Sequence, residues 1–419
     1  MHTDSSREAG FRGRAFTTLV IMAMRGATQV AKFGLTLFVA RFLDLETLGL
    51  YGLIAGLTVI LPVVAGLGLF NCLSRNAVTQ TLPETIGEAR RYLEIQAVVH
   101  ALVLAAAALA GTLWSGALLA TLVVVTVLLE HLNNDISTLL NHLRRPRLSN
   151  VLMFVRSAAW IAVYVALALL LPSLRTLPAL LAFWIGGSLV AVVAFTVATR
   201  DWPWASALAA GRPRGWFRDR FLESRALYVN HLANIVGQFL DRYLVGLFMG
   251  LELTGVYFLF WSIGNALMNL VRTGMIQVSE PHLIRAYGRR DGSYAGLFRR
   301  FVLEVVLTTA LFGLVTAGLA HYGLPYLQRP LLADWLPVLW LILLGAVLRM
   351  IYEVQEVNLY SRREDIRILA SSIAVFAVSL IANLLLVPRY ALYGPAMAMM
   401  LACIVGIAYR HVLIAGGSR

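Results

Sequence analysis

Runs of about 20 apolar residues recur along the whole chain, and they limit the possible folds more than any other feature. Each run is long enough to cross the roughly 30 Å hydrocarbon core of a bilayer as an α-helix. The period-2 alternation that a membrane barrel requires is not found, which leaves helices as the spanning form. A hydrophobic fraction of 59% and a charged fraction of 14% agree with this. The sequence therefore predicts an all-α integral membrane protein.

Hydropathy predicts twelve transmembrane helices, and the loops between them predict the orientation. Arginine is concentrated in alternate loops, including the end of the chain with Arg410 and Arg419, whereas the other loops hold only four arginines. Since arginine-rich loops remain in the cytoplasm, both termini are expected there. This distribution explains the net charge of +13 without a nucleic-acid partner. The predicted spans are 16–40, 47–70, 92–113, 116–140, 149–171, 177–199, 226–249, 254–278, 299–321, 335–359, 367–387 and 392–414.

One seven-residue motif occurs twice, 206 residues apart. Its copies are Leu45–Tyr51 and Leu251–Tyr257, and the apolar segments that precede them also align at this offset. The chain is therefore interpreted as two copies of one unit. Each copy places a glutamate at a helix start, where a carboxylate is favourable. Gly49 and Gly255 would allow neighbouring helices to approach closely, so a structural role is predicted for the motif.

The longest basic connection, 200–225, predicts the boundary between the two copies. It contains Pro203 and Pro213 among glycine, aromatic and basic residues, as a linker does. Because each half has six spans, both halves enter the membrane in the same direction, which predicts parallel repeats. The expected organisation is an N-terminal six-helix lobe at 1–199, a cytoplasmic linker at 200–225 and a C-terminal six-helix lobe at 226–419.

A polar pair also repeats, at an offset of 218 residues. His131 and Asp135 in the first half correspond to Arg349 and Glu353 in the second. A basic group four residues before a carboxylate lies on the same helix face. If transport is coupled to H⁺ or Na⁺, the expected ion-coupling candidates are Asp241, Glu353, Asp135 and His231.

Six cations lie at the predicted membrane depth, where each costs about 2.5–3.5 kcal/mol at the centre of a helix. Such residues usually face a wet interior. Arg25, Gln29 and Lys32 recur at helical spacing and form a polar stripe, and similar stripes are predicted on spans 226–249 and 254–278. The stripes predict a polar cleft between the halves. The candidate substrate-binding residues are Arg25, Lys32, Arg272, Arg349, Arg156, Gln29, Asn234, Gln238, Asn265 and Asn269.

Structural explanations compete for four of the six cations. Arg156 and Arg272 lie within about two turns of a cytoplasmic end, from which a long arginine can snorkel. Arg349 can be neutralised by Glu353, and Arg242 by the aspartate that precedes it. These explanations stay open beside a role in substrate binding.

Arg25 and Lys32 have no nearby carboxylate in their own helix, which favours a functional role for both. Most of the membrane-depth arginines are predicted in the cytoplasmic half or near the middle of the membrane. A cationic cleft in that place would bind an anion presented from the inner leaflet, and arginine matches phosphate oxygens. A lipid phosphate or pyrophosphate is the expected ligand.

The first two predicted spans are joined through the segment Phe-Val-Ala-Arg-Phe-Leu-Asp-Leu-Glu-Thr-Leu-Gly-Leu-Tyr at 38–51. With this segment and twelve spans in two parallel halves, the chain resembles the polysaccharide transporter branch of the multidrug/oligosaccharidyl-lipid/polysaccharide (MOP) flippase superfamily. That branch includes O-antigen and exopolysaccharide flippases. The resemblance covers essentially the whole chain. It implies a V-shaped, MATE-like fold of two lobes in the bacterial cytoplasmic (inner) membrane. It also implies alternating access that moves an undecaprenyl-pyrophosphate-linked oligosaccharide from the inner to the outer leaflet.

The resemblance implies a cavity role for two cations, and it does so only through the helix on which each lies and its approximate depth. Arg25 and Arg272 lie on the first and eighth spans, which hold cavity arginines in the related peptidoglycan-precursor flippases. Those relatives have 14 spans, so a separate lipid-tail groove built from two extra helices is not expected here.

Other classes of protein fit the sequence less well. A cation-coupled drug or metabolite antiporter of the same superfamily would prefer acidic groups in its cavity, and a major facilitator would need a basic signature loop that 74–91 lacks. A polysaccharide polymerase or ligase would need a large outward loop, and a scaffold without transport activity stays open. We expect no enzyme activity, catalytic residue, cofactor or metal. The expected partners are the lipid-linked oligosaccharide, membrane lipids and a coupling ion, with a polysaccharide polymerase as a further candidate.

Overall fold

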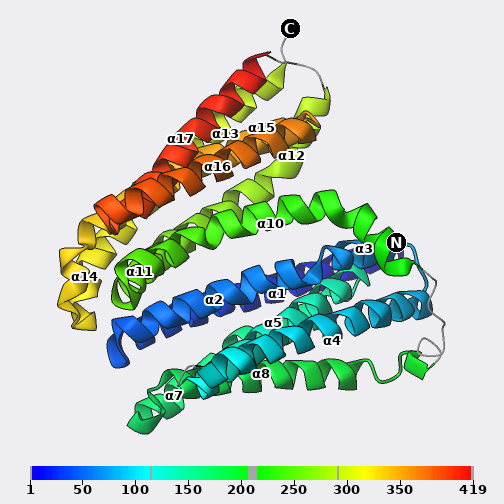
Figure 1. The fold of residues 1–419 in the computed structure, drawn as a ribbon. Helices are drawn as coiled ribbons and strands as arrows, with labels where there is room; N and C mark the ends of the chain where they lie inside the picture. Colours follow the sequence, from blue (N-terminus) through cyan, green and yellow to red (C-terminus); the bar gives the residue numbers. More distant parts are fainter. Residues whose placement is uncertain (1, 114–115, 206–214, 290–291, 417–419) are drawn as a thin grey trace. The chain divides into compact units, whose positions relative to one another are not determined.

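A computed structural model describes the chain except for residues 1, 114–115, 206–214, 290–291 and 417–419, and the described part is helical without strands (Figure 1). The α-helices are α1 (His2–Phe42), α2 (Leu45–Gly66), α3 (Leu69–Asn76), α4 (Leu82–Leu113), α5 (Ala117–His142), α6 (Pro146–Phe154), α7 (Trp160–Leu170), α8 (Leu177–Ala198), α10 (Trp216–Met249), α11 (Leu251–Val271), α12 (Gln277–Arg289), α13 (Ser293–Gly323), α14 (Pro330–Asp334), α15 (Leu336–Ser361), α16 (Asp365–Tyr390) and α17 (Tyr393–Gly416). Two π-helical turns, η1 (Val155–Ala159) and η3 (Arg272–Ile276), interrupt long helices, and η2 (Pro172–Leu174) and η4 (Leu324–Leu327) are 3₁₀ turns.

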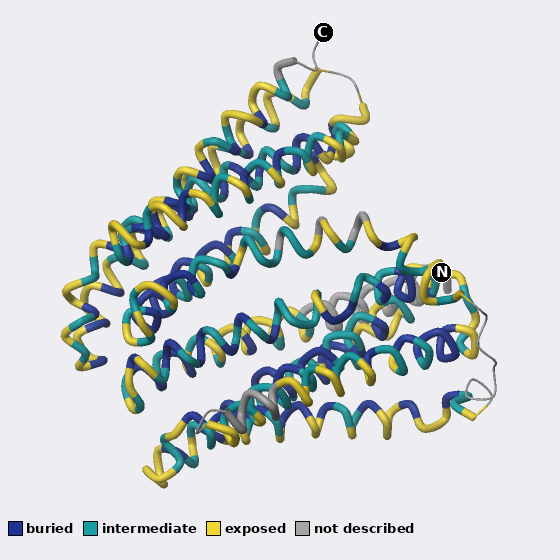
Figure 2. Tube along the Cα trace, viewed as in Figure 1, coloured by how far each residue is buried: buried dark blue, intermediate teal, exposed yellow. Residues whose placement is uncertain are grey.

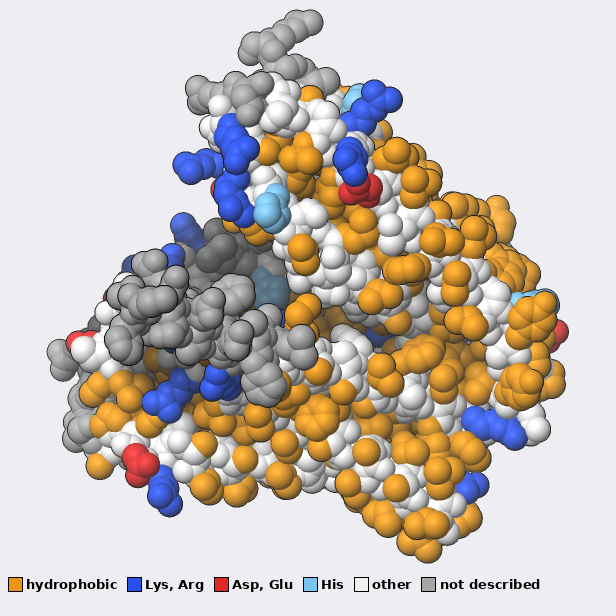
Figure 3. All heavy atoms as spheres, turned by 180° about the vertical axis from the view of Figure 1, so that it is seen from behind, with side chains coloured by type: hydrophobic (Ala, Val, Ile, Leu, Met, Phe, Trp, Pro, Cys, Tyr) orange, Lys and Arg blue, Asp and Glu red, His pale blue; other side chains and the backbone are white. Residues whose placement is uncertain are grey.

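Eleven of the twelve predicted spans fall, to within one residue at each end, on one of these helices or on helices joined by a π-turn. The predicted span 47–70 is too long, because α2 ends at Gly66 and the chain turns at Leu67 and Gly68, both with positive φ, before α3 begins. Within the described residues, nine helical segments are long and apolar enough to cross a membrane by length and composition. The other three predicted spans lie on α1, α4 and α10, which begin with polar turns before the apolar segment. Exposed residues recur along the helices (Figure 2), and many of them are large apolar side chains. Hydrophobic side chains cover much of the face drawn in Figure 3, as expected for surfaces that contact lipid.

The chain divides into two compact units. Unit 1 consists of Met1–Leu35 and Ile54–Leu232, and unit 2 of Thr36–Leu53 and Ala233–Arg419, so the divisions fall inside α1, α2 and α10. In unit 1, α5 packs on α4, α6 and α8. In unit 2, α15 packs on α11, α13 and α17, and α16 packs on α17. The expected lobes with their linker at 200–225 stay a prediction.

The two copies of the repeated motif pack against each other inside unit 2. A Cβ atom on Gly255 would lie 1.9 Å from the carbonyl oxygen of Leu45, and one on Gly49 would lie 2.1 Å from the carbonyl oxygen of Leu251. The contact is therefore reciprocal, and only hydrogen fits at either position. Tyr51 adds an edge-to-face ring contact with Phe258 at 5.7 Å. The close helix approach predicted from the two glycines is confirmed.

Arg410 corrects one sequence-based assignment, because it lies in α17 and not in a loop. Its side chain is fully buried in unit 2. The guanidinium donates to the Ser371 hydroxyl at 2.9 Å, the Tyr352 carbonyl at 2.7 Å and Glu356 at 3.0 Å, and it lies 3.6 Å from the centre of the Tyr352 ring. Hydrogen bonds and the face of the Tyr352 ring compensate the desolvation of this charge. Arg410, which the sequence pattern assigned to the cytoplasmic end of the chain, therefore stabilises the packing of helices in unit 2.

A charged cluster joins the ends of α3, α4 and α10 in unit 1. Arg220 contacts Glu88 at 3.1 Å and donates to Glu223 at 2.8 Å, and Arg75 also pairs with Glu223. The hydrogen bond from Arg220 is the main cause of the lowered pKa of Glu223, which lies before the predicted span 226–249. The cluster fixes the start of α10 to the unit.

We expect Glu223→Gln to lower the free energy of unfolding by about 0.5–1 kcal/mol at neutral pH, because the pair is partly exposed. A pKa that is lower in the folded state gives stability that is present above the unfolded pKa, near 4.5, and lost as the pH falls through the folded value. In detergent, the melting temperature of Glu223→Gln should therefore be lower than that of the parent at neutral pH and equal to it in acid. Glu252→Gln, at an exposed helix start, is the control; a difference that persists in acid would contradict the assignment.

Candidate functional site

Two arginines and one glutamate form a compact cluster in unit 2. Arg272 begins the π-turn η3, and Arg349 and Glu353 lie one turn apart on α15. Arg272 donates to both carboxylate oxygens of Glu353, at 2.8 and 2.6 Å, and Arg349 donates to the same carboxylate at 3.0 Å. Asn269 accepts a third hydrogen bond from Arg272 at 2.7 Å. The π-turn changes the register of the helix where Arg272 leaves it, a geometry that is frequent at functional sites.

The cluster carries a net charge of +1, since one carboxylate faces two guanidiniums. The carboxylate is the more buried partner, with 13% of the Glu353 side chain exposed against 30% for Arg272 and 40% for Arg349. The positive groups therefore form the accessible side of the cluster. The expected neutralisation of Arg349 by Glu353 occurs, but the same carboxylate is shared with Arg272, and a cationic surface remains for an anion.

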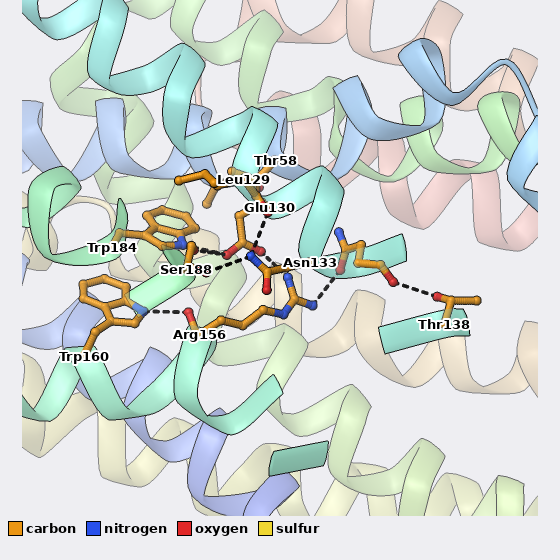
Figure 4. Close-up of polar contacts among 11 residues, drawn as sticks. Thr58, Leu129, Glu130, Asn133, Thr138, Arg156, Trp160, Trp184 and Ser188 are labelled. Atoms are coloured by element: carbon orange, nitrogen blue, oxygen red, sulfur yellow. Dashed lines mark hydrogen bonds and ion pairs between the residues drawn. The ribbon is translucent and has the colours of Figure 1, made fainter. Parts of the chain in front are cut away.

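Arg156 forms a different arrangement in unit 1, where it is buried with 6% exposure (Figure 4). It lies on the π-turn η1 and donates to Glu130 on α5 at 2.5 Å and to Asn134 at 2.6 Å. Trp184 and Ser188 on α8 donate to the other oxygen of Glu130, at 2.9 and 3.2 Å (Figure 4). The pair is neutral and enclosed, so Arg156 does not reach an exposed position as a snorkelling side chain would.

Arg25, Gln29 and Lys32 lie on one stretch of α1 and are exposed in unit 1. Arg25 donates to Asn150 at 3.0 Å and makes no ion pair with the described residues. Lys32 interacts electrostatically with Glu130 and Arg156. This part of α1 thus carries two cations, of which Lys32 lies near the buried pair, and the predicted polar stripe stays a prediction.

The remaining predicted residues lie on α10 and α11. Gln238 and His231 are exposed, and Asn265 is half-buried. Asn234 also lies on α10, but its side chain is outside the described part. No described contact brings the side chains of Gln238, His231 and Asn265 to the arginine cluster.

Asp241 and Arg242 differ from a simple ion pair. Asp241 accepts hydrogen bonds from the Tyr257 hydroxyl and from the Arg242 backbone amide, while the two charged side chains are 4.0 Å apart. Arg242 is 1% exposed, and its guanidinium lies 4.0 Å from the ring centre of Trp261 and 4.7 Å from that of Phe239. Aromatic faces, together with the aspartate, accommodate this charge.

Sequence reasoning overlooked Glu130 and Tyr92. Glu130 is a carboxylate at membrane depth within the predicted span 116–140, and an arginine on the following span was the signal that could have paired them. Tyr92 stands at the edge of a span, and nothing in its spacing indicates that it bonds to Asp135 at 2.7 Å. Among the described residues, no group of three or more His, Cys, Asp or Glu could hold a metal ion.

Solved structures define the class of protein to which this fold belongs. An inward-facing multidrug resistance MATE family transporter of the MOP superfamily matches with a TM-score of 0.71 and 13% identity, over 93% of this chain and 95% of that chain. The lipid II flippase MurJ in an inward closed conformation matches with a TM-score of 0.70 and 12% identity, over 95% of this chain and 87% of that one. The fold is that of a multi-pass membrane protein of the MOP type.

The family model described as polysaccharide biosynthesis protein matches residues 17–285, and the chain belongs to this family. No curated protein matches the sequence.

Proposed function

We propose that the protein is a flippase that moves an undecaprenyl-pyrophosphate-linked oligosaccharide from the inner to the outer leaflet of the bacterial cytoplasmic membrane by alternating access. The observation that carries the proposal is the Arg272–Arg349–Glu353 cluster, whose accessible side is cationic. The membership in the polysaccharide biosynthesis family supports a glycan-bearing substrate. Both termini are proposed to lie in the cytoplasm.

The pyrophosphate is proposed to bind the accessible side of the Arg272–Arg349–Glu353 cluster in unit 2. Arg25 and Lys32 are proposed as anion-binding residues of unit 1. Guanidinium groups bind phosphate oxygens with parallel charge-assisted hydrogen bonds, which a lysine or an amide cannot reproduce. Arg156 is assigned a structural role, because its hydrogen bonds to Glu130 and Asn134 occupy it. The glycan is proposed to contact amides, and these are Gln29, Asn234, Gln238, Asn265 and Asn269.

A cation-coupled antiporter is the alternative within the same fold, and a MATE transporter is among the structural neighbours. A cationic substrate would need accessible carboxylates, whereas Glu353 is shared by two arginines. A polymerase or ligase is less well supported. Arg329, in the connection between the predicted spans 299–321 and 335–359, donates to the backbone carbonyls of Ala40 and Leu43 and so positions the chain. We therefore propose a protein without enzyme activity.

Flipping of a fluorescent lipid-linked oligosaccharide in proteoliposomes tests the proposal. We expect Arg272→Ala to lower flipping about 10- to 100-fold, since a charge-assisted hydrogen bond contributes about 1.5–3 kcal/mol. Glu353 keeps Arg349 as its partner in this variant, which preserves the folded state. Arg25→Ala should also lower flipping, whereas Arg300→Ala, an exposed arginine paired with Glu304, should not. Full activity in both Arg272→Ala and Arg25→Ala would refute the anion site.

A further inference from the structure

Four titratable side chains in unit 1 form one continuous hydrogen-bonded chain. Asp135 accepts from the Tyr92 hydroxyl at 2.7 Å, the Tyr92 oxygen lies 3.1 Å from His131 Nε2, and His131 Nδ1 lies 3.0 Å from His100 Nε2. Tyr92 and His100 come from α4, and His131 and Asp135 from α5, two helices that lie side by side (Figure 1). Since eight residues separate Tyr92 from His100, the chain extends about 12 Å along α4.

The ends of this chain are more accessible than its centre. Tyr92 is 1% and His131 is 3% exposed, whereas Asp135 and His100 are half-buried. Apolar side chains surround the centre: Leu69 and Leu73 of α3 pack on Tyr92, whose ring also contacts Phe70 at 5.3 Å. The two accessible ends, Asp135 and His100, are therefore connected through the hydrogen bonds of the buried Tyr92 and His131.

The hydrogen bonds assign one direction to the chain. Because Tyr92 donates its proton to the Asp135 carboxylate, its oxygen accepts from His131 Nε2–H. His131 Nδ1 must then be the acceptor of His100 Nε2–H. Each donor thus points toward Asp135, which is the arrangement that a proton relay requires.

Asp135 differs from Glu353 and Asp241, because the basic group beside it is a titratable histidine and not an arginine. Glu353 is bound by two arginines, and Asp241 is next to Arg242. Asp135 lies 3.5 Å from His131, at the position where the second half of the chain has Arg349 beside Glu353. An arginine keeps its charge at every physiological pH, whereas a histidine gains or loses it.

Other groups near the relay are already paired or apolar. Glu88, one turn before Tyr92 on α4, is bound by Arg220 and Asn76. Glu130, next to His131, is bound by Arg156. From α2, Gly66 faces the relay: a Cβ there would lie 3.7 Å from His131 Nε2. The neighbouring carboxylates Glu88 and Glu130 are thus neutralised by partners outside the relay.

We propose that His100, His131, Tyr92 and Asp135 form a proton-binding relay that makes substrate movement respond to a proton gradient. A proton that binds His100 Nδ1 releases the His100 Nε2 proton to His131 Nδ1. The His131 Nε2 proton then passes to the Tyr92 oxygen, and the Tyr92 hydroxyl proton passes to Asp135. One proton enters at His100, and Asp135 becomes a neutral acid, while His100, His131 and Tyr92 each gain one proton and pass one on and so keep their charge. The role in transport rests on the proposed flippase function, whereas proton binding does not.

Two measurements on the full chain in proteoliposomes test the relay. Infrared difference spectra between acidic and neutral buffer should show a carboxylic-acid band that Asp135→Asn removes and that Tyr92→Phe shifts. Flipping should rise with an imposed proton gradient in the parent protein and lose this response in both variants. Tyr164→Phe, which removes a buried hydroxyl that donates to the Leu174 carbonyl outside the relay, is the matched control and should behave as the parent.

Tyr92→Phe keeps the ring that packs on Phe70, so it tests the relay even where Asp135→Asn does not fold. An unchanged carboxylic-acid band in Asp135→Asn, or a full gradient response in Tyr92→Phe, would overturn the relay. If the parent protein does not flip the lipid at all, the proposed function fails, and the infrared titration still decides whether the relay binds a proton.

Discussion

Replacing Arg156 with leucine is expected to lower the free energy of unfolding by about 3–5 kcal/mol, because it leaves Glu130 buried without its charged partner. Glu130 retains hydrogen bonds from Trp184 and Ser188, but neither group carries a positive charge. Thermal or denaturant unfolding of the purified protein in detergent measures the loss.

A double substitution distinguishes the destabilisation caused by a buried unpaired charge from that caused by lost packing. In Glu130→Gln combined with Arg156→Met, both charges are removed, and most of the stability should return, since neutral replacement of a buried ion pair is often nearly without cost. Asn134 then loses its donor, which is a smaller effect. If the free energy of unfolding of Arg156→Leu lies within about 0.5 kcal/mol of that of the parent, the Arg156–Glu130 pair does not stabilise unit 1 as expected.

Gly255→Ala is the second variant with a large expected effect, a loss of about 3 kcal/mol or failure to fold. The added methyl group would lie 1.9 Å from the Leu45 carbonyl oxygen and 3.1 Å from the Gly49 nitrogen, which are backbone atoms that cannot turn aside. The two helices would have to move apart and lose the Tyr51–Phe258 contact. Expression level and melting temperature in detergent measure this.

Gly318→Ala provides the control for that variant. Gly318 lies in α13 of the same unit, and a Cβ atom there meets nothing within 4 Å. Alanine should be neutral or should stabilise the helix by up to about 1 kcal/mol. Equal melting temperatures for Gly255→Ala and the parent would show that the repeated motif does not hold the helices together.

The pattern of residues along the chain was enough to predict the helices and the repeat. Apolar runs placed eleven of the twelve predicted spans on helices and overextended the span 47–70 past the end of α2. The glycines of Leu45–Tyr51 and Leu251–Tyr257 indicated a close helix approach. Polar spacing also placed Arg349 and Glu353 on one helix face, where they pair at 3.0 Å. These are local properties, because helix geometry relates residues that are close in sequence.

The partners of the charged residues could not be read in this way. Arg272 binds a carboxylate 81 residues away, and Arg156 binds one 26 residues away on another helix. Spacing along one helix indicated that Arg156 could snorkel, and it gave no reason to single out Tyr92 or His100. A contact between helices depends on how each is rotated and on where π-turns change its register, and hydropathy contains neither.

The sequence by itself determined a duplicated helical membrane protein with too many charges in its spans to be accounted for by lipid contact alone. The tertiary structure decided which charges are neutralised and which remain accessible: Arg156 is enclosed with Glu130, while Arg272 and Arg349 share one carboxylate and keep a net positive charge. The physical reason is that apolar periodicity fixes each helix through its own hydrogen bonds, whereas the state of a charge depends on its desolvation and on partners brought from other helices.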